Sequence, residues 1–385
     1  MNKYFRLTLF KATAIILSIC TVIFIYLFIK SFNLDKQSKT IIINDKSQIY
    51  NQEFNRNFIL GTVQQIDSDI VGSSDRIFGW FKDGMLVSVR NSGVLSVNKE
   101  SNYRQIGKIG IKGSNLEVVK INNKNVSQWA WVSPDEENIL ISECDYESKN
   151  GPSFNIFMYD AKSISSVGDE DVVWCEWSDN SRYAVCIRSS KKDFIIYDAK
   201  TGEKKILNKP DEFTQINGSK ISDDGKTIFF IGEYWGGKGP TSFKLCSINL
   251  DNIGFVNTIV DNIVGFDFIN NRKSIVCLET SVGGAGLIVY DLSSREKIKI
   301  DNHVADYWLS KDKKRIAYNK YSSNVLYTAK IDNSEIKEIT SIYKSEAFNG
   351  GNSIRLYWSN DNKKILVTQN NRESKTFPNF ILNLL

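Results

Sequence analysis

A short phrase recurs about every 45 residues along the C-terminal four-fifths of the chain, and it constrains the fold more than any other feature. Each copy has an aromatic or aliphatic residue, then a polar cluster typical of a tight turn, then a run rich in strand-forming residues. The copies begin at Phe81, Val132, Trp177, Ile221, Phe268, Leu309 and Trp358. A regular period of this length is the signature of a repeat architecture. The repeats leave no room for a second independent domain in a chain of 385 residues.

Each repeat reads as four short strands with turns between them. In the copy at Trp177, one apolar run leads into the turn, a second leaves it, a third ends in Tyr-Asp, and a fourth is short. These runs are Val172–Trp177, Tyr183–Ile187, Phe194–Asp198 and Lys204–Leu207. Four antiparallel strands in each period make one blade of a β-propeller. Seven copies therefore predict an all-β propeller of seven four-stranded blades, and the drifting first copy makes six blades the alternative.

The last repeat lacks its fourth strand. After the copy at Trp358, only the run Asn379–Leu384 remains. A lone strand-like segment, Phe58–Ile66, precedes the first repeat and can supply the missing edge. Closing the ring in this way removes the exposed sheet edges that favour aggregation. We therefore expect the two ends of the propeller domain to share one blade.

The repeat resembles the TolB-type, or WD-like, propeller repeat, in which an aromatic residue and Ser-Pro-Asp-Gly-Lys precede a strand. Ser133–Asp135 and Ser222–Lys226 match that pattern most closely, and the resemblance covers roughly residues 77–385. It implies the propeller fold. It implies no particular activity, because such repeats occur in partner-binding periplasmic proteins, in peptidase gating domains and in surface proteins of no known activity.

The N-terminus differs in kind from the repeats. Residues 12–29 form an uncharged, mostly aliphatic run that reaches the minimum length of a membrane-spanning helix. A cleaved signal peptide is the alternative, but it would need a shorter apolar core and a small-residue cleavage site, which the following residues lack. We therefore predict one transmembrane signal anchor at residues 12–29.

The flanking segments set the expected topology. Basic residues in segment 1–11 place that segment in the cytoplasm, because a long following domain is translocated largely regardless of its charge. Residues 30–56 are mostly polar and read as a stalk. We expect the propeller domain, residues 57–385, to lie outside the cytoplasm, held at the cell membrane by a single pass.

Six cysteines are present, and none belongs to a CxxC or Cys/His cluster. Cys20 loosely resembles a lipoprotein site, but Ile19 stands where a small residue is needed, so we place Cys20 within the helix. The other five are Cys144, Cys175, Cys186, Cys246 and Cys277. All but Cys144 lie in apolar strand-like runs, where a free Cys behaves as a small buried hydrophobe. One disulfide is the alternative, since the domain is expected to face an oxidising space.

The catalytic inventory of the chain is thin. His303 is the single histidine, and no nucleophile elbow, P-loop or dinucleotide fingerprint occurs. Acidic clusters at residues 67–69 and 168–171 lack the spacing of a calcium loop. The formal charge of +5 is spread over interspersed acids and bases, which is not typical of a nucleic-acid-binding stripe. We expect no enzyme activity, no cofactor, no metal and no nucleic-acid partner.

Loop length distinguishes the two faces of the predicted wheel. The turn phrases are short and uniform, whereas several connections between second and third strands are long. These long loops are residues 143–152, 233–240, 280–286 and 370–378. Binding residues concentrate in such loops, and exposed aromatics make good anchors. The candidate binding residues here are Tyr146, Tyr234, Trp235 and Lys238. The alternative for Trp235 is that it folds back to cap its own blade.

Ionisable residues on the first strands of several repeats are expected to line the central channel. They are Glu176, Lys220, Asp267, Asp306 and Arg355. We take Asp267, Asp306 and Arg355 as further candidate ligand contacts. The alternative is structural, with these charges paired to each other across neighbouring blades.

Together these features predict a membrane-anchored extracytoplasmic propeller that acts as a non-catalytic binding or scaffolding module. Its expected partner is a protein, peptide or glycan at the cell surface. The alternative is an enzyme that acts on cell-surface glycan or peptide through the channel carboxylates Glu176, Asp267 and Asp306. A third interpretation is a spacer that positions a neighbouring complex at the membrane.

Overall fold

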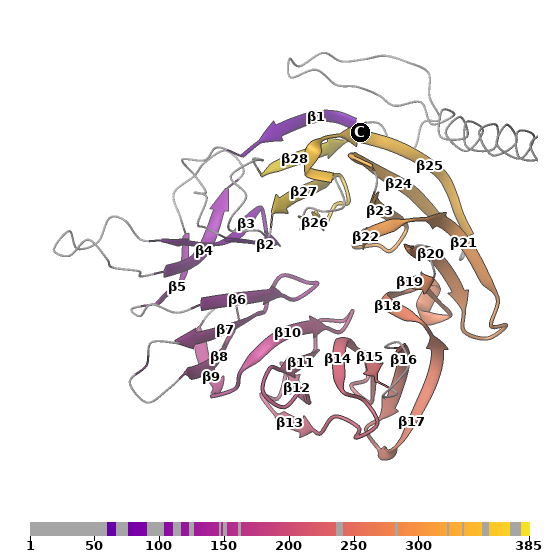
Figure 1. Ribbon diagram of the computed structural model, residues 1–385. Coiled ribbons are helices and arrows are strands. Elements are labelled where there is room, and N and C mark those ends of the chain that lie inside the picture. Colours follow the sequence, from indigo (N-terminus) through magenta and orange to yellow (C-terminus); the bar gives the residue numbers. More distant parts are fainter. Residues whose placement is uncertain are drawn as a thin grey trace, which may run out of the picture.

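The computed structural model describes residues 60–66, 76–90, 104–110, 117–122, 127–145, 148, 152–160, 163–235, 242–281, 284–321, 323–332, 335–348, 354–369 and 379–385. These residues form seven four-stranded antiparallel sheets, or blades, arranged around a central axis (Figure 1). The seven-bladed, all-β prediction is therefore confirmed. The predicted cytoplasmic segment, membrane anchor and stalk, residues 1–56, lie outside the described residues, and no helix within the described part is long and apolar enough to cross a membrane.

The blades are numbered in chain order, each from its innermost strand outward. Blade 1 contains β2 (Arg76–Phe81), β3 (Gly84–Arg90), β4 (Arg104–Gly110) and β5 (Glu117–Asn122), and blade 2 contains β6 (Ser127–Val132), β7 (Ile139–Asp145), β8 (Ser153–Tyr159) and β9 (Ile164–Gly168). Blade 3 contains β10 (Val172–Trp177), β11 (Tyr183–Arg188), β12 (Phe194–Asp198) and β13 (Lys204–Leu207), and blade 4 contains β14 (Gln215–Ile221), β15 (Thr227–Tyr234), β16 (Ser242–Asn249) and β17 (Asn252–Asp261).

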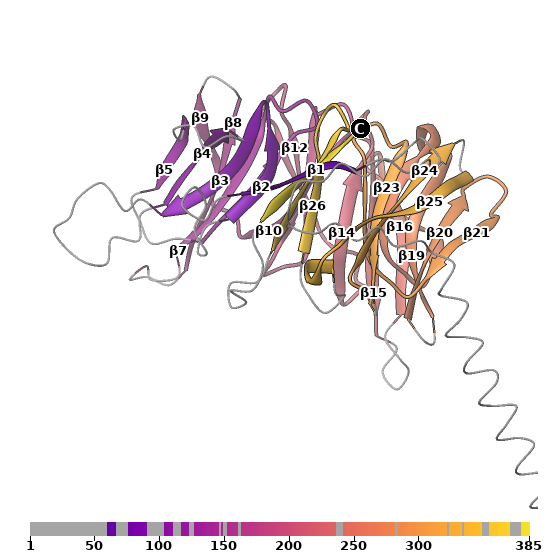
Figure 2. The ribbon, with the colours of Figure 1, turned by 90° about the horizontal axis from the view of Figure 1, so that it is seen from above.

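Blade 5 contains β18 (Ile263–Ile269), β19 (Ser274–Ser281), β20 (Gly284–Asp291) and β21 (Lys297–Asn302), and blade 6 contains β22 (Val304–Leu309), β23 (Arg315–Lys320), β24 (Val325–Asp332) and β25 (Glu335–Lys344). Blade 7 contains β26 (Ile354–Trp358), β27 (Lys364–Gln369), β28 (Phe380–Leu384) and β1 (Leu60–Gln65). Within the described residues, two 3-10 turns, η2 (Asn270–Arg272) and η3 (Glu346–Phe348), lie between strands. Seen from the side, the strands run between the two faces of the wheel (Figure 2).

The wheel is closed by strands from both ends of the propeller domain. β1 pairs antiparallel with β28, with Val63 opposite Leu382, and so provides the outer strand of blade 7. Figure 1 shows the indigo β1 beside the yellow β28. The expectation that a strand before the first repeat completes the last blade is confirmed. The third strand of blade 7, β28, is thus paired on both sides, with β27 and with β1. This removes a site for intermolecular strand pairing.

The recurring phrase is a hairpin turn built on a serine. In blade 3 the Ser178 hydroxyl donates to Asn180 Oδ1 over 2.7 Å and accepts the Tyr183 N–H over 2.9 Å, while Ser181 adopts a left-handed φ of 62°. Equivalent serine contacts recur in blades 2, 4, 6 and 7, at Ser133, Ser222, Ser310 and Ser359. The side chains here satisfy backbone groups that the tight turn leaves unpaired. The repeated phrase therefore encodes the wheel's turns.

Tryptophans at or next to the first position of the phrase join neighbouring blades. The indole N–H of Trp177 donates to the carbonyl of Trp131 over 3.0 Å, and that of Trp358 donates to the carbonyl of Trp308 over 3.1 Å. Trp80 makes the same bond to the carbonyl of blade 7's Tyr357 over 2.8 Å, which joins the first blade to the last. A buried indole needs a hydrogen-bond acceptor, and the inner strand of the preceding blade supplies one.

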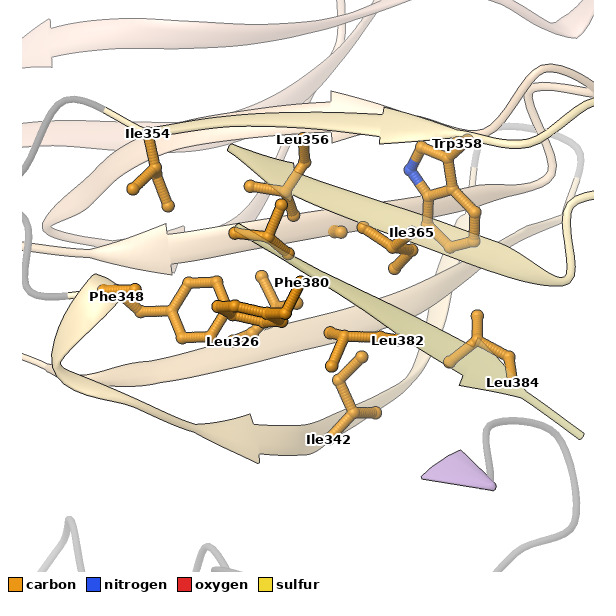
Figure 3. Close-up of a cluster of buried hydrophobic side chains, with 13 residues drawn as sticks. Leu326, Ile342, Phe348, Ile354, Leu356, Trp358, Ile365, Phe380, Leu382 and Leu384 are labelled. Atoms are coloured by element: carbon orange, nitrogen blue, oxygen red, sulfur yellow. The ribbon is translucent and has the colours of Figure 1, made fainter. Parts of the chain in front are cut away.

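The hydrophobic core is divided among the contacts between blades. Between blades 6 and 7, Leu326 of β24 and Phe348 of η3 pack against Leu356, Trp358 and Phe380 (Figure 3). The Phe348 and Phe380 rings meet edge to face with centroids 6.1 Å apart. Six further clusters of this kind link the described blades. Because both faces of each sheet are covered, its two middle strands are buried along most of their length, as β11 and β12 of blade 3 show.

Some strands are longer than the sequence predicted. Cys144, which we placed at the start of a long loop, lies in β7 opposite Phe154 of β8, and Tyr234 similarly belongs to β15. The partner strand holds these polar stretches in the ladder despite their loop-like composition. The five cysteines of the described residues are buried and free, so the alternative of one disulfide is not found there. Cys20 lies outside the described residues.

Candidate functional site

A cavity of about 1130 Å³ lies along the axis of the wheel, lined by the inner strand of every blade. Two rings of positions face it. The turn-proximal ring consists of the residues one before each phrase: Trp80, Trp131, Glu176, Lys220, Asp267, Trp308 and Tyr357. The loop-proximal ring consists of the residues three before it: Phe78, Trp129, Trp174, Gly218, Gly265, Asp306 and Arg355. In both rings the aromatic and charged side chains are gathered on different sides of the axis.

Irregular pairing near the loop side shapes the cavity wall. Five of the described inner strands have a bulge against their second strand, located before Gly79, Trp174, Ser219, Gly265 and Asp306. A bulge re-aims the side chains beside it and increases the local twist. Gly79 has a φ of 131°, and a Cβ there would lie 2.9 Å from a ring carbon of Tyr357. Glycine is therefore needed where blade 1 approaches blade 7.

The charged side of the turn-proximal ring is an ion-paired triplet. Lys220 Nζ lies 2.9 Å from Glu176 Oε1 and 2.8 Å from Asp267 Oδ1, so one ammonium joins blades 3, 4 and 5. Burial alone would lower the pKa of Lys220, but the two carboxylates outweigh it and hold that pKa above its ordinary value. The structural alternative, charges paired across neighbouring blades, therefore describes Glu176, Lys220 and Asp267.

Asp306 and Arg355 of the loop-proximal ring behave differently. Burial raises the pKa of Asp306 to about 6, against the lowering effects of the Tyr307 N–H, which donates to Oδ1 over 2.8 Å, and of Arg355. Part of the Asp306 side chain still touches the open cavity. Burial raises the pKa of the Tyr357 hydroxyl, and Arg355, which lies beside that hydroxyl, offsets the rise only in part. Within the described part of the chain, neither Asp306 nor Arg355 has an oppositely charged side chain within 4.0 Å.

The aromatic side of the loop-proximal ring comes from blades 1 to 3. Trp174 keeps 39% of its surface exposed although it lines the cavity. Trp129 of the preceding blade is covered on one face by the Arg76 guanidinium, 4.4 Å from the ring centroid. Trp174 therefore offers the more accessible aromatic surface inside the cavity.

Ion pairs span the turn side of the cavity. Lys313 Nζ of blade 6 lies 2.6 Å from Asp179 Oδ2 of blade 3, and Arg272 of blade 5 lies 3.5 Å from that same oxygen. Arg272 also lies 3.4 Å from Asp223 of blade 4. Burial raises the pKa of Asp179, but Lys313 and Arg272 outweigh it and leave that pKa lowered. Four blades are thus tied together across this mouth.

Blade 5 departs from the common turn at this mouth. Three consecutive residues, Asn270, Asn271 and Arg272, have left-handed φ angles of 49°, 50° and 64°. Such a run costs free energy and persists only where surrounding contacts hold it. The contacts here include the Phe268 ring, 5.2 Å below the Arg272 guanidinium. The unusual turn places Arg272 over the cavity, where it meets the acidic residues of blades 3 and 4.

The predicted loop-face residues are separate from the cavity. Tyr234 ends β15 with 45% of its surface exposed, and Trp235 follows it with 64% exposed. So large an exposure argues against the alternative in which Trp235 caps its own blade. Tyr146 and Lys238 lie outside the described residues. The structure therefore gathers Asp267, Asp306 and Arg355 at the axis, and keeps the exposed aromatic pair at the end of β15 in blade 4.

Other polar residues that the sequence analysis considered as candidate sites lie in ion pairs or in turns of the fold. Glu170, of the acidic cluster 168–171, lies 3.0 Å from Arg188 and 3.1 Å from Lys204. His303 occupies an exposed left-handed turn with a φ of 56°. Across the described ranges, no three His, Cys, Asp or Glu side chains are grouped to hold a metal ion, and the acidic cluster 67–69 lies outside them.

Sequence reasoning missed two parts of this site. Trp129 and Trp174 were not proposed as cavity residues, although counting three positions back from each phrase would have placed them in one ring with Asp306. The Lys313–Asp179 pair was also missed. These two residues are 134 positions apart and belong to turns that look interchangeable in the sequence.

No known protein family matches the chain, and no curated protein matches it. Solved structures do. An oligogalacturonate lyase in complex with manganese is 10% identical, with a TM-score of 0.42 over 80% of this chain and 99% of that one. The Cps50 (Swd1) β-propeller domain of Myceliophteria thermophila is 10% identical, with a TM-score of 0.46 over 68% and 85% of the two chains. A chain of the mitotic checkpoint complex is 9% identical, with a TM-score of 0.49 over 90% and 98%.

The fold is a seven-bladed β-propeller. This assignment rests on the seven four-stranded blades and on the closure of blade 7 by β1, which the strand pairing of this chain establishes directly. Likeness to other proteins at such low identity extends to the fold alone, because one propeller scaffold carries many unrelated activities.

Proposed function

We propose that this protein is a membrane-anchored, extracytoplasmic TolB-type propeller that binds a cell-surface partner through its long-loop face without catalysing a reaction. The observation that carries the proposal is the exposed pair Tyr234 and Trp235 at the loop end of β15. Large aromatics contribute strongly to binding when a partner buries them, and these two are not used by the core. Their position beside a glycine-rich loop, residues 236–239, lets a partner approach closely.

The charges in the channel support a binding module over an enzyme. A glycan-cleaving pair would need two carboxylates facing a substrate at catalytic separation. Glu176 and Asp267 instead share Lys220. Asp306 is then the one member of the proposed catalytic set without an ion pair among the described residues.

The predicted anchor and stalk would hold this binding module at the membrane surface. An uncharged run at residues 12–29 would hold the chain in the membrane, and the 27 residues of segment 30–56 would reach at most roughly 97 Å if fully extended. A tethered wheel of this kind can meet partners on the surface of its own cell. Anchoring also raises the effective concentration of the wheel near such partners.

Affinity capture from native membranes tests the proposal. The full chain and its Tyr234→Ala/Trp235→Ala variant are tagged, expressed and purified in mild detergent, and the co-purifying partners are quantified by mass spectrometry. Phe255→Ala is the matched control, because Phe255 lies on the outer strand of the same blade and is 76% exposed. We expect the double variant to lose at least about tenfold of a specific partner, as for a hot-spot residue, with no loss in the control. Equal recovery from all three proteins would remove this loop from the binding site.

A further inference from the structure

We propose that the loop side of the cavity binds the terminal pyranose of a neutral glycan, stacked on Trp174 and hydrogen-bonded by Asp306 and Arg355. The inference rests on the proposed function, because it names the chemical class of a ligand that enters from the same face. It concerns the axial cavity, whereas the partner-binding proposal concerns the exposed loop of blade 4.

The arrangement of the blades places these three side chains on opposite walls. In a ring of seven blades, the point across the axis from blade 3 lies between blades 6 and 7. Trp174 belongs to blade 3, and Asp306 and Arg355 belong to blades 6 and 7. An aromatic surface and a pair of opposite charges therefore face each other across the cavity.

The cavity wall between them carries glycine instead of side chains. Gly218 of blade 4 and Gly265 of blade 5 occupy the intervening positions of the loop-proximal ring. A Cβ added to Gly218 would meet nothing within 4 Å, so the space beside that strand is open. This gap leaves room for a ring-shaped ligand between Trp174 and the charged pair.

A pyranose matches both walls at once. One face of the sugar presents C–H groups with small positive charge, which suit the negative π face of an exposed indole. Its rim presents hydroxyls, each of which can donate and accept hydrogen bonds. Asp306 can accept from such a hydroxyl, and Arg355 can donate to one.

Charge balance favours a neutral ligand. Asp306 and Arg355 have opposite charges, so an anion would face the carboxylate and a cation would face the guanidinium. The ammonium of Lys220 is already paired with Glu176 and Asp267. A neutral polyhydroxylated ring can satisfy both charged groups without adding a charge to a partly desolvated site.

The direction of entry follows from the two mouths. The turn side is spanned by the Lys313–Asp179 ion pair. Towards the loop side the inner strand of blade 3 becomes exposed at Val173 and Trp174, whereas Trp177 near the turn is buried. A glycan chain would therefore enter from the loop side with its terminal sugar deepest. The cavity volume of about 1130 Å³ also holds more than one ring, which allows an internal portion of the chain to follow.

Binding to immobilised glycans tests the inference. The full chain in detergent micelles is applied to an array of neutral, uronate-bearing and sulfated oligosaccharides, with immobilised dipeptides as the peptide arm. Affinities are then measured for Trp174→Ala, Asp306→Ala and the aromatic-preserving Trp174→Phe, with Val173→Ala as the exposed neighbour outside the cavity. We expect retention by at least one neutral glycan, an affinity loss of at least about tenfold in both alanine variants, a smaller loss in Trp174→Phe, and a change below about threefold in Val173→Ala.

Three results would overturn the inference: retention by no neutral glycan, retention by charged glycans or dipeptides alone, or retention that both alanine variants leave unchanged. Thermal melting of each variant shows whether it is folded, and the Trp174→Phe and Asp306→Ala proteins decide the matter if Trp174→Ala does not fold. The partner-capture experiment separates the two proposals. If glycan affinity depends on Trp174 but partner recovery does not depend on Tyr234 and Trp235, the glycan proposal is supported and the partner-binding proposal is refuted. The opposite pattern would refute the glycan proposal and support the partner-binding proposal.

Discussion

Lys313 of blade 6 donates to Asp179 of blade 3 over 2.6 Å, across the axis of the wheel. The two residues belong to the same turn phrase in different repeats, and Arg272 of blade 5 approaches the same carboxylate. A propeller's blades otherwise contact mainly their neighbours. This contact therefore links parts of the ring that the repeat architecture leaves separate.

The cross-axis contact predicts a modest and salt-sensitive contribution to stability. We expect Asp179→Asn to lower the free energy of unfolding by about 0.5–1 kcal/mol at low salt, since the carboxylate serves two cations but remains partly exposed. Urea unfolding at low and high salt measures this. Asp251→Asn is the control, because its pair with Lys226 is more exposed. A loss no larger than in the control would contradict the prediction.

Asp179 should also make the stability of the fold depend on pH. Its pKa is lowered in the folded state, so its contribution is present above the unfolded-state pKa near 4 and is lost as pH falls through the lower folded-state pKa. The stability difference between wild type and Asp179→Asn should therefore shrink below pH ~4. Urea midpoints of both proteins at pH 3 and pH 6 show whether it does. A difference of the same size at both pH values would count against the ion pair.

The shared ammonium of Lys220 predicts a larger effect. Lys220→Met would leave Glu176 and Asp267 partly buried without their partner, and we expect a loss of about 2–3 kcal/mol in unfolding free energy. Adding Glu176→Gln and Asp267→Asn to that variant should restore most of the loss, because the unpaired charges are then gone. Denaturant unfolding of the single and triple variants measures both. A single variant as stable as wild type would show that the triplet contributes nothing.

Asp306 predicts the opposite pH behaviour. Burial raises its folded pKa to about 6, above the unfolded value near 4, so its ionisation weakens the fold as pH rises through that interval. Arg355 and Asp267 are the charged groups that act on it, with the Tyr307 N–H as its hydrogen-bond donor. Because Asp306 is exposed to the solvent of the cavity, which screens its charge, Asp306→Asn should stabilise the protein at pH 7.5 by only about 1 kcal/mol, and by much less at pH 4.5. An equal effect at the two pH values would contradict the raised pKa.

The closing strand predicts a sharp difference between two truncations. A chain that starts at residue 60 keeps β1, whereas a chain that starts at residue 67 exposes the edge of β28. We expect the shorter chain to lose several kcal/mol of stability and to aggregate, since an unpaired edge invites intermolecular pairing. Denaturant unfolding and light scattering compare the two. Similar stability and solubility would show that blade 7 does not depend on β1.

The fold followed from the sequence because its determinants are local and repeated. The serine turn at Ser178 is encoded within six residues, and seven copies of such a phrase predict seven blades. Closure by the segment before the first repeat was also predictable, because the last repeat lacked a strand. The ends of the strands were harder to predict. Cys144, for example, lies in a stretch of loop-like composition but pairs with Phe154 in a strand.

The candidate site was only partly predictable. The charge pattern placed Asp267, Asp306 and Arg355 at the axis, and the structure puts all three in the cavity wall. The charge pattern in the sequence could not show that Asp267 is ion-paired whereas Asp306 is not. That difference depends on how the bulged strands orient their side chains. Trp174 was missed for the same reason.

Photocrosslinking at the loop face tests the central claim most directly. A photoreactive amino acid is placed at position 235 of the full chain in intact cells, with position 255 on the outer strand of the same blade as the matched control site. Our account predicts that one specific surface partner is crosslinked from position 235 and not from position 255. Crosslinking of no specific partner from 235, or of the same partner equally from both positions, would contradict it.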